Sequence, residues 1–320
     1  MDRAGLSDGL TLTTRRPHWV VGLCLTSAMG FSAARAEAPE TPRPAIYSDC
    51  RGEKTAAPTV VLESGTFGSS SDWDRVLADL APSWRVCAYD RPGVGRSEPQ
   101  AGPRDVVTVA NNLRALLLSL GETQPIILVG HSNGALYAET YAALFPGQVA
   151  GLVYVDGVGS DDLDYPELLG DLAAERRLSN LAVIAGRLGL APFIARSAIH
   201  RYGMTGLAAA SKHASLVSVK GLRVARDEDR EIIPGLTTAR ALGGSPSNIP
   251  TVVIVAARDY DNPLMRAWQS AETAPALRAS RSWTLIMQGA THVSPLSRDR
   301  AYVIAAVKWL ESLPHPDIGH

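Results

Sequence analysis

The stretch Ile126-Ile127-Leu128-Val129-Gly130-His131-Ser132-Asn133-Gly134 decides the fold of this 320-residue chain. It begins as a short apolar run rich in β-branched residues, which is typical of a buried strand, and it leads into a helical pattern over 135–145. Glycines two residues before and after Ser132 allow a strand and a helix to approach closely at a sharp turn. The stretch therefore predicts a strained turn that exposes the Ser132 hydroxyl.

Similar short apolar runs, each ending in turn-forming residues, recur on both sides of this stretch. They alternate with segments whose apolar residues recur at helical spacing, and Asp105 is a candidate cap for the first of these. This alternation predicts an α/β fold with a mostly parallel central sheet flanked by helices on both faces. The predicted strands are 59–64, 85–90, 126–129, 151–156, 251–256 and 283–286, and the predicted helices are 106–120, 135–145 and 301–313.

The alternation stops between the two halves of the predicted sheet. Residues 157–248 contain apolar helical material over 178–199 and a charged run at 226–231, which we interpret as a solvated helix face. This segment is predicted to be an inserted helical cap between a first core part (37–156) and a second (249–320). Its apolar residues either line a pocket for a hydrophobic substrate or pack the cap onto the body.

A serine hydroxyl needs a base to become a good nucleophile, and His292 is the predicted base. It follows the last predicted strand, in a loop that returns to the carboxyl edge of the sheet, whereas His315 and His320 lie in a proline-bracketed tail. His131 is predicted to pack beside the turn rather than to act as the base. The other histidines after Ser132 fall in the predicted cap, without the spacing of metal ligands.

The base in turn needs an acid that orients it, and three aspartates are candidates. Asp259 follows the predicted strand 251–256 closely and is the preferred assignment. Asp261 lies two residues further into the same loop, and Asp156 ends the preceding strand. Each of the three also has a structural alternative, as a loop hydrogen-bond acceptor or a helix cap.

Negative charge that develops on a substrate carbonyl oxygen needs backbone N–H groups already directed at it. One candidate donor is the N–H of Asn133, which directly follows Ser132 at the start of a predicted helix. The other is the N–H of Thr66, in the loop 64–68, where Gly65 allows the chain to turn. The alternative is that these glycines only form tight turns.

These motifs together resemble those of the α/β-hydrolase superfamily. The segments 62–68, 89–97, 130–134, 257–259 and 289–292 occur in that family's order, and the resemblance spans about 46–313. It implies an exported serine esterase or lipase-like enzyme with nucleophile Ser132, acid Asp259 and base His292. It further implies an oxyanion hole formed by Thr66 and Asn133, and a structural role for the loop 90–97.

The sequence departs from the family at one place, because many members have His-Gly where this chain has Ser64-Gly65. The backbone donor survives this change, but any role of that histidine does not transfer. The expected reaction is hydrolysis of a carboxylic ester through an acyl-enzyme, with no cofactor and no metal. The expected partner is a small-molecule ester with an apolar portion.

Several other functions use the same fold. An epoxide hydrolase or a haloalkane dehalogenase needs a carboxylate nucleophile, and position 132 is a serine. Lactonases, peptidases or amidases, thioesterases, acyltransferases and cofactor-free haloperoxidases keep the serine triad, so they stay open as alternatives. A catalytically silent binding module is the alternative outside the enzymes.

Composition excludes further classes. The chain is 46% hydrophobic and 20% charged, which is ordinary for a globular protein. Its 31 Lys and Arg nearly balance 32 Asp and Glu, so no long-range field favours nucleic acid or an anionic membrane. No lysine follows a glycine, which excludes a P-loop nucleotidase. Oligomeric state cannot be predicted from these features.

The amino terminus has the features of a cleaved secretory signal peptide over 1–36. Arg15 and Arg16 precede an apolar run at 19–31, and the small-residue motif Ala34-Arg35-Ala36 follows. Export is therefore predicted, through either the general or the twin-arginine route, although an uncleaved anchor or a plain extension would give a similar pattern. Cleavage would remove Cys24 and leave Cys50 and Cys87, as a disulfide or as two buried thiols.

Overall fold

A computed structural model describes residues 44–202, 204–257 and 261–314. The predicted signal peptide (1–36) lies outside the described residues, and so does Asp259. Within the described part of the chain, no helix has the length and apolar character needed to cross a bilayer.

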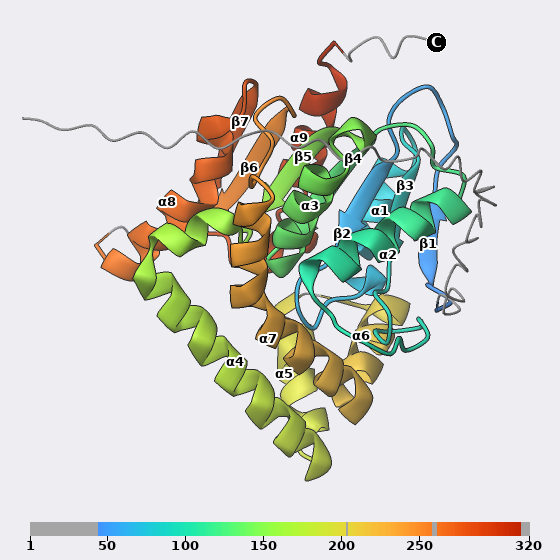
Figure 1. The fold of residues 1–320 in the computed structure, drawn as a ribbon. Coiled ribbons are helices and arrows are strands. Elements are labelled where there is room, and N and C mark those ends of the chain that lie inside the picture. Colours follow the sequence, from blue (N-terminus) through green and yellow to red (C-terminus); the bar gives the residue numbers. More distant parts are fainter. Residues whose placement is uncertain (1–43, 203, 258–260, 315–320) are drawn as a thin grey trace, which may run out of the picture. The chain divides into compact units, whose positions relative to one another are not determined.

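The centre of the fold is a sheet in the order β1-β3-β2-β4-β5-β6-β7 (Figure 1). Only β1 runs antiparallel to its neighbour, β3, and the other pairs are parallel. The mostly parallel sheet predicted from the sequence is therefore confirmed. The strands are β1 (Ser48–Arg51), β2 (Val60–Glu63), β3 (Val86–Tyr89), β4 (Ile126–His131), β5 (Val149–Val155), β6 (Thr251–Ala256) and β7 (Ser282–Met287).

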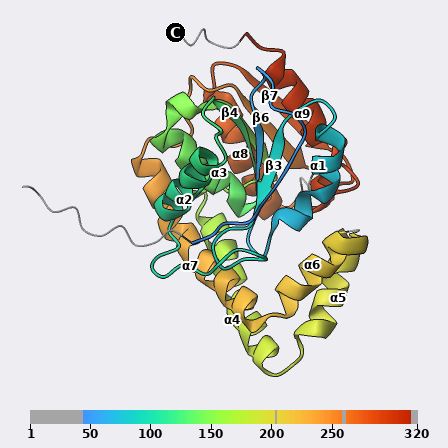
Figure 2. The ribbon, with the colours of Figure 1, turned by 90° about the vertical axis from the view of Figure 1, so that its right-hand side faces the viewer.

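Helices cover both faces of this sheet (Figure 2). On one face, α1 and α9 pack on side chains such as Val60 and Leu62 of β2, and on the other face α2, α3 and α8 pack on side chains such as Val61. Neighbouring strand residues alternate between the two apolar clusters because successive side chains point to opposite faces. The helices are α1 (Asp74–Leu80), α2 (Val106–Ser119), α3 (Asn133–Leu144), α8 (Pro263–Arg278) and α9 (Ala301–Glu311).

The chain between β5 and β6 forms a further group of helices, the helical insertion. It comprises α4 (Pro166–Arg187), α5 (Ala191–Tyr202), α6 (Gly206–Val217) and α7 (Val219–Ala241). Helix α7 contacts α2 and α3, α4 contacts α8, and α6 contacts the short helix η1 (Ser70–Trp73). In Figure 2 the insertion lies at one end of the sheet. The helical pattern expected over 178–199 is interrupted at Gly189, whose φ of 75° ends α4.

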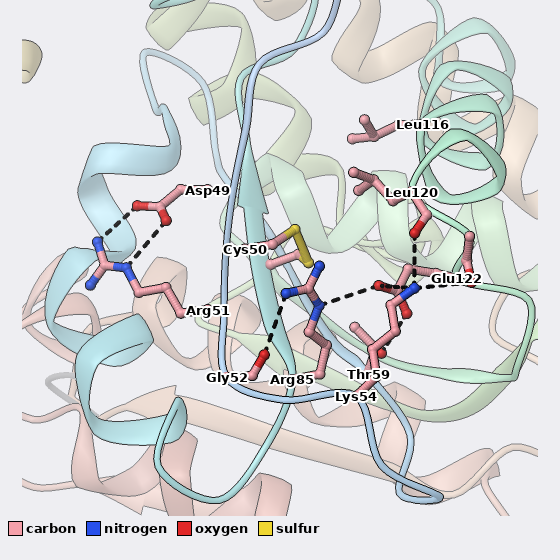
Figure 3. The surroundings of a disulfide bond; sticks show 12 residues. Asp49, Cys50, Arg51, Gly52, Lys54, Thr59, Arg85, Leu116, Leu120 and Glu122 are labelled. Carbon is pink, nitrogen blue, oxygen red and sulfur yellow. Dashed lines mark hydrogen bonds and ion pairs between the residues drawn. A yellow bond between two sulfur atoms is a disulfide. The ribbon is translucent and has the colours of Figure 1, made fainter.

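Cys50 and Cys87 form a disulfide with an S–S distance of 2.10 Å. The two residues lie directly opposite each other in the antiparallel pair β1–β3, which resolves the alternative left open by the sequence. Beside the disulfide, the buried carboxylate of Glu122 accepts hydrogen bonds from Thr59 and Arg85 (Figure 3). These contacts attach the first strands of the chain to the end of α2.

Candidate active site

Ser132 lies between the end of β4 and the start of α3, at φ 55° and ψ −128°. This backbone conformation is strained for a residue with a side chain, and it is stabilised by the close approach of the elements around it. A Cβ atom on Gly130 would lie 2.4 Å from the carbonyl oxygen of Gly134, and one on Gly134 would lie 2.5 Å from that of Glu63. Both glycines are therefore required, and the strained turn predicted at Ser132 is present.

The base predicted from the sequence is hydrogen-bonded to a carboxylate. Nδ1 of His292 lies 2.6 Å from Oδ2 of Asp156, whose side chain is completely buried, while the His292 side chain is 46% exposed. The other carboxylate oxygen accepts a hydrogen bond from the backbone N–H of Ala256, at 2.9 Å. An ionised carboxylate only accepts, so Nδ1 carries the proton and Nε2 is left free to accept one. This is the tautomer that a general base needs.

The preferred acid of the sequence analysis, Asp259, lies outside the described residues, so its placement stays a prediction. Asp261 is exposed in the turn before α8. The carboxylate that the structure places against His292 is that of Asp156, the third candidate, which directly follows β5. The sequence feature that pointed to Asp156 was its position at the end of a strand. Asp259 also follows a strand end, so this feature did not distinguish the two aspartates.

Ser132 and His292 line one cavity, of about 950 Å³. Among the described residues, no hydrogen bond joins the Ser132 hydroxyl to the His292 ring. Catalytic hydrogen bonds are often long in enzymes without substrate and shorten when the substrate binds. The structure therefore places the predicted nucleophile and base on the wall of the same cavity, as separate side chains.

His131 packs beside the turn, as predicted. Its buried Nε2 lies 2.7 Å from the backbone carbonyl oxygen of His292 and, because a carbonyl only accepts, this nitrogen carries the proton. Burial and the neighbouring His292 ring lower the pKa of His131 to about 3, so the ring stays neutral. His131 thus holds the backbone of the loop that carries the base.

The loop that carries Thr66 is held through its carbonyl oxygens. Arg91 donates to the carbonyl oxygens of Ser64, at 2.5 Å, and Gly65, at 2.9 Å, and Lys212 of α6 donates to that of Phe67, at 2.7 Å. In a trans peptide the C=O and the following N–H point in opposite directions. By holding the Gly65 carbonyl, Arg91 therefore fixes the direction of the Thr66 N–H.

Arg91 is itself held by two buried carboxylates. It forms ion pairs with Glu63 of β2, at 2.7 Å, and with Glu228 of α7, at 2.8 Å. Burial alone lowers the pKa of Arg91, but the two carboxylates keep it well above its ordinary value. The interpretation of 226–231 as a solvated helix face is therefore wrong for Glu228 and for its neighbour Asp229, which are both buried. Sequence reasoning could not find their buried partners, which come from distant segments.

Most of the cavity wall is apolar, and three acidic side chains interrupt it: Asp72, which is paired with Lys212 of α6, Glu175 and Asp229. Asp229 accepts hydrogen bonds from Ser179 of α4 and from the Thr66 side chain, and burial raises its pKa to about 7. Burial also raises the pKa of Glu175, one turn before Ser179 on α4. The helical insertion therefore contributes much of the apolar surface and two of the three acids of the cavity, whereas Asp72 comes from η1. Within the described residues, no cluster of three His, Cys, Asp or Glu side chains is arranged to hold a metal ion.

Comparisons with known proteins agree with this architecture. Residues 58–186 match the family described as alpha/beta hydrolase fold. An AB hydrolase superfamily protein of Gibberella zeae is 30% identical over 128 residues, or 39% of each chain. The matches to curated relatives span 17% to 41% of those proteins' lengths.

Two solved structures show the same fold over most of the chain. An esterase from Thermogutta terrifontis has a TM-score of 0.60 at 22% identity, and covers 83% of this chain and 93% of that one. An enol-lactonase from Burkholderia xenovorans has a TM-score of 0.57 at 17% identity, and covers 83% of this chain and 95% of that one. With the sheet and the strained turn at Ser132, these likenesses show that the chain has the α/β-hydrolase fold.

Proposed function

We propose that this protein is a serine hydrolase that cleaves carboxylic esters, with Ser132 as nucleophile, His292 as base and Asp156 as acid. The observation that carries the proposal is the 2.6 Å contact between His292 Nδ1 and Asp156. His292 also lines the same cavity as Ser132. The contact with Asp156 leaves Nε2 of the ring available to take the serine proton.

In the proposed reaction, Ser132 Oγ attacks the ester carbonyl carbon while His292 takes the hydroxyl proton. The backbone N–H groups of Thr66 and Asn133 bind the oxyanion, and the start of α3 at Asn133 supports this role because the amino end of a helix favours negative charge. His292 then gives the proton to the leaving alcohol. In the second half of the reaction, His292 takes a proton from a water molecule that attacks the acyl carbon, and it returns that proton to Ser132 Oγ as the acid product leaves. No cofactor is needed.

The cavity supports a substrate with an apolar acyl or alcohol portion. Its wall includes Leu178 and Ala182 of α4, Ala195 of α5 and Ile232 of α7, so burying hydrocarbon there is favourable. A panel of p-nitrophenyl esters of increasing acyl length, with lactones and amino-acid amides alongside, identifies the preferred substrate. Faster turnover of amides than of matched esters would contradict the proposal.

The proposal is tested by Ser132→Ala, with Ser119→Ala as the control for loss of an exposed serine. Ser132→Ala is expected to lower kcat on a p-nitrophenyl ester by about 10⁴ to 10⁶-fold and to abolish labelling by a fluorophosphonate probe. Ser119→Ala keeps both. Ester hydrolysis by Ser132→Ala at the wild-type rate would rule out the assignment, and an unlabelled wild type would favour a binding module.

We also propose that the protein is exported after removal of residues 1–36. The Cys50–Cys87 disulfide supports this proposal because structural disulfides persist in oxidising compartments. Amino-terminal sequencing of the protein from the extracytoplasmic fraction is expected to begin at Glu37. Recovery of the intact chain from the cytoplasm alone would contradict export.

A further inference from the structure

Where α4 ends and α5 begins, the chain exposes a group of large apolar side chains. We call it the apolar tip, and it consists of Leu181, Ile184, Leu188, Leu190, Phe193 and Ile194, which are between 49% and 79% exposed. Figure 2 shows this turn at the end of the insertion that points away from the sheet. Single exposed apolar residues are common on soluble proteins, but a continuous group marks an interaction surface.

In the segment of the chain that contains the apolar tip, every charged residue is basic. Residues 176–226 contain nine Lys and Arg and no Asp or Glu, which the chain's near-neutral total conceals. Between Leu178 and Ala195 the one ionisable side chain is that of Arg187, and Arg196 follows on α5. Both arginines are exposed. The absence of a field favouring an anionic membrane, inferred from the total charge, therefore does not hold for this segment.

We propose that the apolar tip docks on a lipid bilayer with anionic headgroups. An apolar helical surface bordered by arginines is suited to the boundary between headgroups and acyl chains, where the apolar side chains leave water and the cations meet lipid phosphates. A second copy of the chain fits less well, because a symmetric pairing of tips brings Arg187 and Arg196 of both copies together. The lipid surface is the occupant that satisfies both the apolar side chains and the charges.

The apolar tip is continuous with the wall of the active-site cavity. Leu181 and Ile194 belong to the tip and also line the cavity that contains Ser132 and His292. Docking would therefore bring the cavity against the bilayer. If the proposed ester hydrolysis is correct, an ester with a long acyl chain can pass from the bilayer along apolar side chains without crossing water.

Binding is measured without turnover, by co-sedimentation with vesicles of phosphatidylcholine alone or with phosphatidylglycerol added. Leu188→Ser/Phe193→Ser is expected to reduce partitioning about 100-fold, since each substitution removes a large apolar side chain from the buried set. Arg187→Gln/Arg196→Gln should lose about fivefold per arginine on the anionic vesicles and little on phosphatidylcholine. Leu277→Ser, at an 84% exposed leucine of α8 outside the tip, is the matched control and should bind as the wild type does.

The apolar stretch 19–31 is present in every variant and could bind vesicles by itself. A fluorescent probe at the tip therefore tests whether the tip is the part that enters the bilayer. With lipids brominated in the acyl chain, the fluorescence of the added tryptophan of Phe193→Trp should be quenched and that of Leu277→Trp should not.

Equal quenching of the two tryptophans, or wild-type vesicle binding by Leu188→Ser/Phe193→Ser, would overturn the proposal. The proposal would also be overturned if the wild type did not bind vesicles and instead formed a dimer in sedimentation velocity that this double variant disrupts. Neither double variant changes a residue of the cavity lining, so both should hydrolyse a soluble short-chain ester at the wild-type rate. This assay tests the proposed function independently of vesicle binding, so failure of one proposal can be distinguished from failure of the other.

Discussion

The carboxylate of Asp156 lies 2.6 Å from Nδ1 of His292, although the two residues are 136 positions apart in the chain. Asp156 is at φ 45°, an uncommon backbone conformation for a residue with a side chain. One carboxylate oxygen is held by the Ala256 N–H and the other faces the histidine. The contact therefore depends on the neighbouring strands β5 and β6 ending together.

Asp156→Asn is expected to lower kcat on the ester by about 10⁴-fold, because an amide in that position no longer stabilises the charged histidine or holds its tautomer. Asp259→Asn is the matched change at the other strand end and should lower kcat far less. The measurement is steady-state hydrolysis over a range of pH. The reverse order of effects would reassign the acid to Asp259.

Arg91→Lys tests the support of the oxyanion loop. A lysine keeps the charge but cannot reproduce the guanidinium contacts with Glu228 and the Gly65 carbonyl, so kcat should fall by about 10 to 100-fold. Arg91→Ala leaves two buried carboxylates unpaired and should lower the free energy of unfolding by about 3 to 5 kcal/mol. Arg96→Lys, in the same loop but half-exposed, should change neither.

Asp229 gives the stability of the protein a pH dependence. Because burial raises its pKa to about 7, the folded protein keeps a proton that the unfolded chain loses near its ordinary pKa of 3.8. Stability due to this group therefore falls as the pH rises between these values. Asp229→Asn cannot ionise, so its stability advantage over the wild type should grow by about 2 to 3 kcal/mol between about pH 5 and pH 8.

Urea unfolding at both pH values measures this difference. Asp227→Asn, at a half-exposed aspartate on the same helix, serves as the control and should show no such trend. A constant difference between wild type and Asp229→Asn across the pH range would show that Asp229 ionises normally in the folded protein.

The disulfide contributes stability by restricting the unfolded chain. Cys50 and Cys87 are 37 positions apart, and closing a loop of that length corresponds to about 4 kcal/mol in the chain-entropy treatment. The double variant Cys50→Ser/Cys87→Ser should lose about this much in urea unfolding. Reductant should lower the stability of the wild type toward that of the double variant and leave the double variant unchanged. Equal stability of the two proteins would mean that the bond adds nothing.

Local sequence patterns predicted much of the fold. The β-branched runs of β2 to β7 and the helical spacing of α2, α3 and α9 agree with the structure to within a few residues. Asp105 caps α2 as predicted, accepting from the backbone N–H groups of Val107 and Thr108. Strand β1 was missed because its sequence Ser-Asp-Cys-Arg has no apolar run. Helix α1 was missed because it is short, and α8 because Pro275 interrupts its pattern.

Local sequence was enough to predict the strained turn at Ser132, because glycines flanking a serine between a strand and a helix are a local signal. It also singled out His292, by its place after the last strand. Tertiary packing, by contrast, brings Asp156 rather than Asp261 to that histidine and buries Glu228 and Asp229. These outcomes depend on side chains from distant segments approaching within a few ångströms, and a one-dimensional pattern does not encode which partner arrives.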